Sequence, residues 1–129
     1  MDNRPIGVFD SGVGGLTVVN ALSKVLPNES IYYVGDTARV PYGNKSKSSI
    51  LKFSLQITKW LLKQNCKVIV IACNTASSLA LSYLKSNLST SIIGVIDPAI
   101  KHAQMKTKNK QIGVLGTRAT INSNIYSSR

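Results

Sequence analysis

One cysteine stands where a parallel α/β sheet places reactive groups. The β-branched run at residues 68–71 predicts a strand, Cys73 lies just past its end, and Asn74 and Thr75 open a predicted helix. Backbone N–H groups and the dipole at a helix start favour negative charge, and so they favour the thiolate form of a cysteine. A thiolate at this edge can act as a base or a nucleophile. The alternative is a buried cysteine that packs as a small hydrophobe.

A second polar turn, DSGVGG at residues 10–15, follows the predicted strand at residues 6–9. Its glycines allow a tight turn and a close approach of the backbone to a ligand. Asp10 can bind an ammonium group or assist a proton transfer, and Ser11 can bind a carboxylate. The glycine spacing does not fit the dinucleotide fingerprint G-x-G-x-x-G. The alternative is an ordinary strand-to-helix turn with Asp10 near the helix start.

A third candidate is the loop GDTARVPYG at residues 35–43, which follows another predicted strand. A loop of this length with an aromatic residue between proline and glycine suits ligand contact. The N–H groups of Tyr42 and Gly43 can hold a carboxylate. The alternative is a structural loop in which Asp36 and Arg39 form an ion pair.

The remaining candidates are weaker. Thr117 and Thr120 can contact a ligand or cap a helix, and Asp97 is expected to cap one. The second cysteine, Cys66, begins the strand that Cys73 ends. Seven residues at ~3.3 Å each separate the two by roughly 23 Å in an extended strand, which excludes one shared crevice. We therefore expect Cys66 to be a filler in the core or at the surface.

Strand and helix patterns alternate along the chain. Strands are predicted at residues 6–9, 31–34, 67–72, 92–96 and 112–115. Helices are predicted at residues 16–26 and 75–86, after Pro98 and from Thr117 onward. A further helix should begin at Ser46 or Ser48, and its apolar stripe comprises Ile50, Phe53, Ile57, Trp60 and Leu61.

Apolar strands that alternate with amphipathic helices predict a parallel sheet covered on both faces. We expect a doubly wound α/β domain, a flavodoxin-like three-layer sandwich with strand order 2-1-3-4-5, over residues 1–129. This order sets strands one and three side by side at the switch point, where ligands bind. Asp10 and Cys73 should then face one crevice.

Composition narrows the class of protein. The 129 residues are 43% hydrophobic, with no apolar run near the ~20 residues that cross a membrane and no signal-peptide pattern, so a cytoplasmic protein is expected. Two cysteines and one histidine, His102, lack metal-ligand spacing, so we expect neither a metal site nor a disulfide. The net charge is +11, but the lysines are scattered and dense only over residues 101–110. We therefore do not expect a nucleic-acid partner.

Five motif runs together resemble the glutamate racemases, within the cofactor-independent aspartate/glutamate racemase superfamily. They are DSGVGG at 10–15, GDTARVPYG at 35–43, ACNTAS at 72–77, GVIDPA at 94–99 and VLGTRAT at 114–120. By position, the resemblance makes Cys73 a catalytic residue and Asp10 the carboxylate that assists it. The substrate-binding positions that it implies are Asp10, Ser11, Pro41, Tyr42, Gly43, Asn74, Thr75, Thr117 and Thr120.

The resemblance implies inversion of L- or D-glutamate by two thiols on opposite faces of the α-carbon, with no cofactor and no metal, to supply D-glutamate for peptidoglycan. In that family the second thiol lies in a Cys-Thr-His motif of a second α/β domain, and this sequence has no such motif. We therefore expect residues 1–129 to be the N-terminal domain, shortened within or just after its last helix and inactive or nearly so alone. The alternatives are aspartate racemase and a non-catalytic small-anion-binding or partner-binding fragment, and a homodimer is left open.

Overall fold

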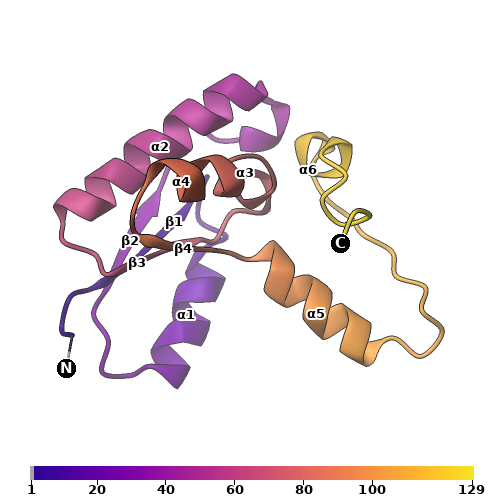
Figure 1. The fold of residues 1–129 in the computed structure, drawn as a ribbon, viewed down its shortest axis with the longest axis horizontal. Coiled ribbons are helices and arrows are strands. Elements are labelled where there is room, and N and C mark those ends of the chain that lie inside the picture. Colours follow the sequence, from indigo (N-terminus) through magenta and orange to yellow (C-terminus); the bar gives the residue numbers. More distant parts are fainter. Residues whose placement is uncertain (1) are drawn as a thin grey trace.

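The computed structural model of the chain describes residues 2–129. Its centre is a sheet of four parallel strands, drawn as arrows in Figure 1. They are β1 (Ile6–Asp10), β2 (Ile31–Gly35), β3 (Val68–Ile71) and β4 (Ser91–Gly94). The order is β2-β1-β3-β4, so β1 and β3 are neighbours, as the sequence predicted.

Helices lie between the strands and after the last one. They are α1 (Leu16–Val25), α2 (Lys47–Lys63), α3 (Asn74–Leu79), α4 (Leu81–Asn87), α5 (Ile96–Lys106) and α6 (Arg118–Asn122), with a short 3-10 turn η1 (Tyr42–Asn44). Ser46 is the N-cap of α2, because its side chain accepts the N–H of Ser49. The helix predicted at residues 75–86 is divided in two at Ala80.

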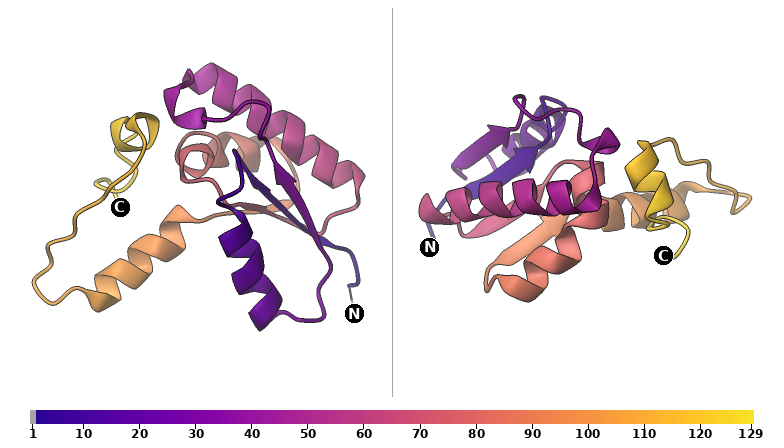
Figure 2. Two further views of the ribbon diagram at one scale, coloured as in Figure 1. Left: turned by 180° about the vertical axis from the view of Figure 1, so that it is seen from behind. Right: turned by 90° about the horizontal axis from the view of Figure 1, so that it is seen from above.

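The sheet is the middle of three layers (Figures 1 and 2). On one face, Phe9, Ile69 and Ile71 pack in a core cluster with buried residues of α2, α3 and α4. On the other face, Val8 and Val70 belong to a cluster against which Val18 and Val19 of α1 pack. The alternation along each strand divides these two sets of side chains, and the predicted three-layer α/β class is confirmed.

The predicted fifth strand is wrong. Residues 112–115 have no strand partner, and Leu115 is fully exposed. A parallel strand needs a crossover that returns beside the sheet. Here α5 runs away from the carboxyl end of β4, and the chain comes back only as α6, beside α3 (Figures 1 and 2). We call residues 2–95 the body and residues 96–129 the arm.

Two apolar side chains of the body are more exposed than expected. Trp60, predicted to lie on the buried stripe of α2, is half exposed. Ile93 of β4 lies beside Val70 in the sheet and is also half exposed, because α1 does not reach that edge. No helix within residues 2–129 is long and apolar enough to cross a membrane.

Candidate active site at the carboxyl edge of the sheet

The neighbouring strands β1 and β3 bring two predicted catalytic residues to one edge of the sheet. Asp10 is the last residue of β1, and Cys73 lies two residues after β3. Both side chains are buried. The Cys73 thiol donates a hydrogen bond to Oγ of Ser11, with 3.4 Å between sulfur and oxygen. The structure therefore assembles the two motif turns, as their places after strands one and three predicted.

Cys73 is the N-cap of α3. Its sulfur accepts the backbone N–H of Ala76 at 3.4 Å. This bond, with the hydroxyl of Ser11 on the other side, places two hydrogen-bonding groups around the sulfur. A thiolate at this position would accept hydrogen bonds from both groups.

Asp10 is held by the backbone of its own turn. Oδ2 accepts the N–H of Gly12 at 3.2 Å and the N–H of Gly15 at 3.0 Å, immediately before α1. Asp10 therefore stabilises the strand-to-helix turn before α1, which is the alternative role that the sequence left open. Both bonds end at Oδ2. Among residues 2–129, none forms a hydrogen bond to Oδ1. The carboxylate is positioned with one oxygen available for chemistry.

The loop after β2 is fixed by a buried polar cluster. The phenol of Tyr42 donates a hydrogen bond to Oδ2 of Asp36, and Arg39 forms an ion pair with the same carboxylate at 2.8 Å. Burial first, and the Asp36 carboxylate second, raise the pKa of Tyr42 far above its usual range. The Asp36–Arg39 pair considered from the sequence is confirmed.

The side chain of Tyr42 is thus part of the scaffold, and the backbone is what the loop offers to a ligand. Pro41 is exposed and precedes η1, and Tyr42 and Gly43 are its first residues. The N–H groups at the start of such a turn have no partner within it. The predicted use of these two N–H groups for a carboxylate is compatible with this geometry.

Three threonines join the body to the arm. Oγ1 of Thr75 lies 2.8 Å from Oγ1 of Thr117 and 3.3 Å from Oγ1 of Thr120, which are 3.0 Å apart from each other. Thr117 caps α6 by accepting the N–H of Thr120. Gly43 is also here, and a Cβ on it would lie 2.5 Å from Cβ of Thr117. Residues that the sequence placed after three different predicted strands therefore meet at one point.

Two polar side chains, Tyr126 and Ser77, make contacts at this site that were not predicted. The Tyr126 hydroxyl donates to Oδ1 of Asn74 at 2.8 Å. The Ser77 hydroxyl donates to the carbonyl of Ile71 at 2.9 Å and accepts the N–H of Val95 at 3.3 Å. Ser77 ends the ACNTAS run, so its motif was a usable signal, whereas Tyr126 lies 52 residues from Asn74 and no local pattern connects them.

Other predicted positions lie elsewhere. Asp97 does not cap α5, because the N-cap is Val95, and Asp97 instead pairs with Arg129 at 2.5 Å. Cys66 is buried in the core, and burial raises the pKa of its thiol. His102 is exposed on α5. Within residues 2–129 no group of three His, Cys, Asp or Glu side chains could hold a metal ion.

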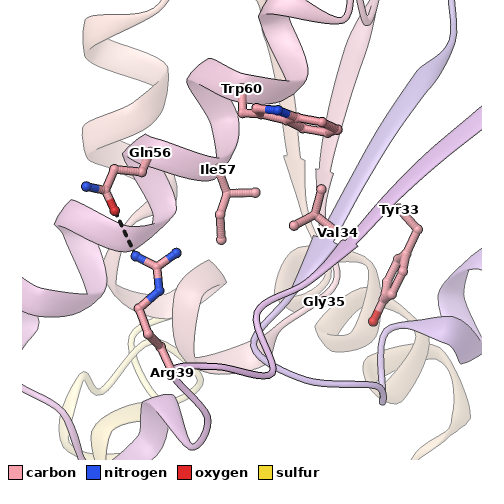
Figure 3. Close-up of a pocket in the computed structure, with 7 residues that line it drawn as sticks. All are labelled: Tyr33, Val34, Gly35, Arg39, Gln56, Ile57 and Trp60. Atoms are coloured by element: carbon pink, nitrogen blue, oxygen red, sulfur yellow. Dashed lines mark hydrogen bonds between the residues drawn. The ribbon is translucent and has the colours of Figure 1, made fainter.

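Two pockets lie away from Cys73 and Ser11. One, of about 500 Å³, is lined by residues of β2, α2 and the loop between them, including Arg39, Gln56 and Trp60 (Figure 3). The other, of about 620 Å³, lies within the arm between α5 and α6, with Thr120 in its wall. Neither is lined by Asp10 or Cys73.

The fold and site define a class: a parallel α/β protein that presents a thiol, a carboxylate and a hydroxyl cluster at the carboxyl edge of its sheet. The model of the family described as Asp/Glu/Hydantoin racemase matches residues 14–129. The chain belongs to this family.

The relatives are named as glutamate racemases. One from Lactococcus lactis subsp. cremoris is 52% identical over 126 residues, which are 98% of this chain and 46% of that protein. A solved glutamate racemase from Thermus thermophilus, bound to β-chloro-D-alanine, matches with a TM-score of 0.90 and 49% identity over 98% of this chain and 48% of that one. The glutamate racemase from Francisella tularensis, solved with D-glutamate, matches with a TM-score of 0.90 and 47% identity. The match covers 99% of this chain and 48% of that one. The chain spans about half the length of the relatives it matches.

Proposed function

We propose that the chain is the thiolate-bearing half of a glutamate racemase site, with Cys73 as the base that removes the α-proton. The single observation that carries this proposal is the placement of Cys73 at a helix start, bonded to Ser11 and beside the Asp10 turn. The family membership and the glutamate racemase relatives at about 50% identity support it.

The proposed step is a proton transfer. The Cys73 thiolate takes the α-proton and becomes a thiol, and the C–H electron pair stays on the α-carbon as a carbanion. Such a carbon acid needs a positioned base and stabilisation of the developing charge. Oδ1 of Asp10 is available to bind the substrate ammonium, which offsets that charge, or to assist the proton transfer. No cofactor or metal takes part in this proposed scheme.

The substrate is held, in this proposal, by donors from the turns at the carboxyl edge of the sheet. Ser11, Asn74 and the N–H groups of Tyr42 and Gly43 face carboxylate groups, and the threonine cluster of Thr75, Thr117 and Thr120 supplies hydroxyls. The enzyme from Francisella tularensis was solved with D-glutamate, which supports glutamate as the ligand. Aspartate is the alternative substrate, because the Cys-Asn-Thr element alone does not distinguish the two.

Inversion also needs a proton donor on the opposite face of the α-carbon. Cys66 begins the stretch that leads into β3, at the end of the strand away from Cys73, and cannot share its crevice. We propose that the second thiol belongs to a second domain, in the half of the relatives that this chain does not match. Residues 1–129 would then be the N-terminal unit of a cytoplasmic enzyme that supplies D-glutamate for peptidoglycan.

The test is exchange of the α-proton of D- and L-glutamate in D₂O, followed by NMR. We expect Cys73→Ala to lower the exchange rate by about 100-fold or more, because general-base catalysis contributes about that much. Cys66→Ala is the matched control and should retain exchange. Equal rates in Cys73→Ala and the unaltered chain would exclude Cys73 as the base. Faster exchange with aspartate than with glutamate would move the proposal to aspartate racemisation.

A further inference from the structure

The side-chain amide of Asn74 can face a ligand with either of two opposite ends. Its oxygen accepts hydrogen bonds and its nitrogen donates them. Asn74 directly follows Cys73 and opens α3, so the end that it presents affects which ligand group can lie beside the thiol. Something must set this orientation if the site is selective.

We propose that Tyr126 is a positioning residue that fixes the Asn74 amide with its donor end free, so that the site selects a carboxylate. The hydroxyl of Tyr126 donates to Oδ1 of Asn74 at 2.8 Å. This bond occupies the acceptor end and leaves Nδ2, which bonds to no other residue among those described. The inference rests on the proposed function of the same site.

In the structure the phenol is the donor and the amide oxygen of Asn74 is the acceptor. Burial raises the pKa of Tyr126, so the hydroxyl keeps the proton that it donates. A flipped amide would turn Oδ1 toward the ligand, where it would repel a carboxylate and favour an ammonium or an amide N–H. An amide held with Nδ2 outward offers a donor, which suits a carboxylate.

Tyr126 comes from the arm, whereas Asn74 belongs to the body. After α6 the chain turns at Asn124, whose φ is 55°, and Arg129 pairs with Asp97 of α5. This turn brings the phenol back to the start of α3. The arm therefore does more than add Thr117 and Thr120 to the site, because it also orients a residue of the body.

A simpler role for Tyr126 is to help dock the arm, and the test must separate the two. Tyr126→Phe removes only the hydroxyl. Tyr83→Phe is the matched control, because Tyr83 is exposed on α4 and its hydroxyl bonds to no described residue. NMR of both variants reports the side-chain amide and ¹³Cγ signals of Asn74, and the backbone signals of Thr117 and Thr120 report whether the arm stays docked.

We expect the Asn74 side-chain signals to shift in Tyr126→Phe and not in Tyr83→Phe, with the Thr117 and Thr120 signals unchanged in both. Unchanged Asn74 signals would overturn the proposal. Loss of the threonine signals together with the Asn74 shift would also overturn it, since Tyr126 would then be a docking residue. This measurement needs no ligand and so does not depend on the proposed function.

Binding gives the second readout. Titrations compare glutamate with its two amides, glutamine and the α-amide, against the unaltered chain and both variants. We expect Tyr126→Phe to weaken glutamate binding by about tenfold and to reduce the preference for glutamate over one of the amides. If Tyr126→Phe lowered the affinity for all three ligands equally, the orientation of the Asn74 amide would not determine selectivity, and the proposal would be overturned. If the unaltered chain binds no glutamate, the proposed function fails, and the NMR result alone decides the role of Tyr126.

Discussion

The body and the arm are stabilised by different interactions. The body has an apolar cluster on each face of its sheet, and residues such as Phe9 and Ile71 are fully buried. The arm leaves Met105, Ile112 and Leu115 exposed and meets the body mainly through the threonine cluster and the bond of Tyr126 to Asn74. The comparison teaches that the candidate site takes residues from a body with an apolar core and from an arm joined to it by side-chain hydrogen bonds, so binding and folding should be separable.

The largest expected effect is on the stability of the body. Phe9→Ala removes a fully buried ring from the core and should lower the free energy of unfolding by about 3–5 kcal/mol. Leu115→Ala, in the fully exposed part of the arm, should change it by less than about 0.5 kcal/mol. Urea unfolding of both variants measures this. Similar losses in the two would contradict the division into body and arm.

Gly43→Ala should separate the arm from the site. The new methyl group would lie 2.5 Å from Cβ of Thr117, so Thr117 and α6 must move. We expect a cost of about 1–3 kcal/mol and loss of the proposed glutamate binding, while the body remains folded. The matched control is Gly113→Ala, because nothing lies within 4 Å of the added methyl group there. Calorimetric titration and circular dichroism of both variants check this, and retained binding in Gly43→Ala would count against a shared site.

The third effect is alkaline destabilisation of the body. The pKa of Tyr42 is raised in the folded chain by burial and by Asp36, whereas in the unfolded chain the phenol ionises near its ordinary pKa of 10.0. The stability from this group is therefore complete below pH 10 and falls as the pH rises above it, since only the unfolded state loses the proton. Urea unfolding at pH 8 and pH 11 measures the loss.

Tyr42→Phe is the control for the alkaline effect. It should be less stable at pH 8 by about 1–3 kcal/mol, because Asp36 loses a buried donor, but its stability should fall less between pH 8 and pH 11. A loss with pH as steep as in the unaltered chain would show that other groups cause it.

The smallest expected effect is at the surface of the arm. Asp97→Asn breaks the ion pair with Arg129, in which both side chains are partly exposed. Exposed pairs of this kind contribute about 0–1 kcal/mol, and high salt weakens them further. Unfolding in low and high salt checks this. A loss well above 1 kcal/mol would mean that the arm depends on this pair more than on the threonines.

The sequence predicted the body well because its signals are local. The strand of residues 68–71, a helix cap at Ser46 or Ser48 and the turn at Asp10 each follow from neighbouring residues, and the structure places the cap at Ser46. Alternation of strands and helices favoured a flavodoxin-like order, which is correct for the first four strands and places the turn at Asp10 beside the turn at Cys73. Trp60 was misplaced because helical spacing marks a stripe but not how far its partner surface extends.

The arm was predicted poorly because its contacts are distant in the sequence. Residues 112–115 have a strand-like pattern, but a strand also needs a neighbour, and the direction of α5 carries them away from β4. The resemblance supplied Thr117 and Thr120 as binding positions, yet nothing local indicated that Tyr126 would reach Asn74. Bonds of this kind follow from the tertiary fold alone.

The measurement that tests the central claim most directly follows exchange and configuration together. The unaltered chain of residues 1–129 is incubated in D₂O with each enantiomer of glutamate, and the deuterated product is then separated on a chiral column. The account predicts that deuterium enters one enantiomer at the α-carbon with its configuration retained, because Cys73 removes and returns protons on one face only. Full inversion by this chain, or no exchange from either enantiomer, would contradict it.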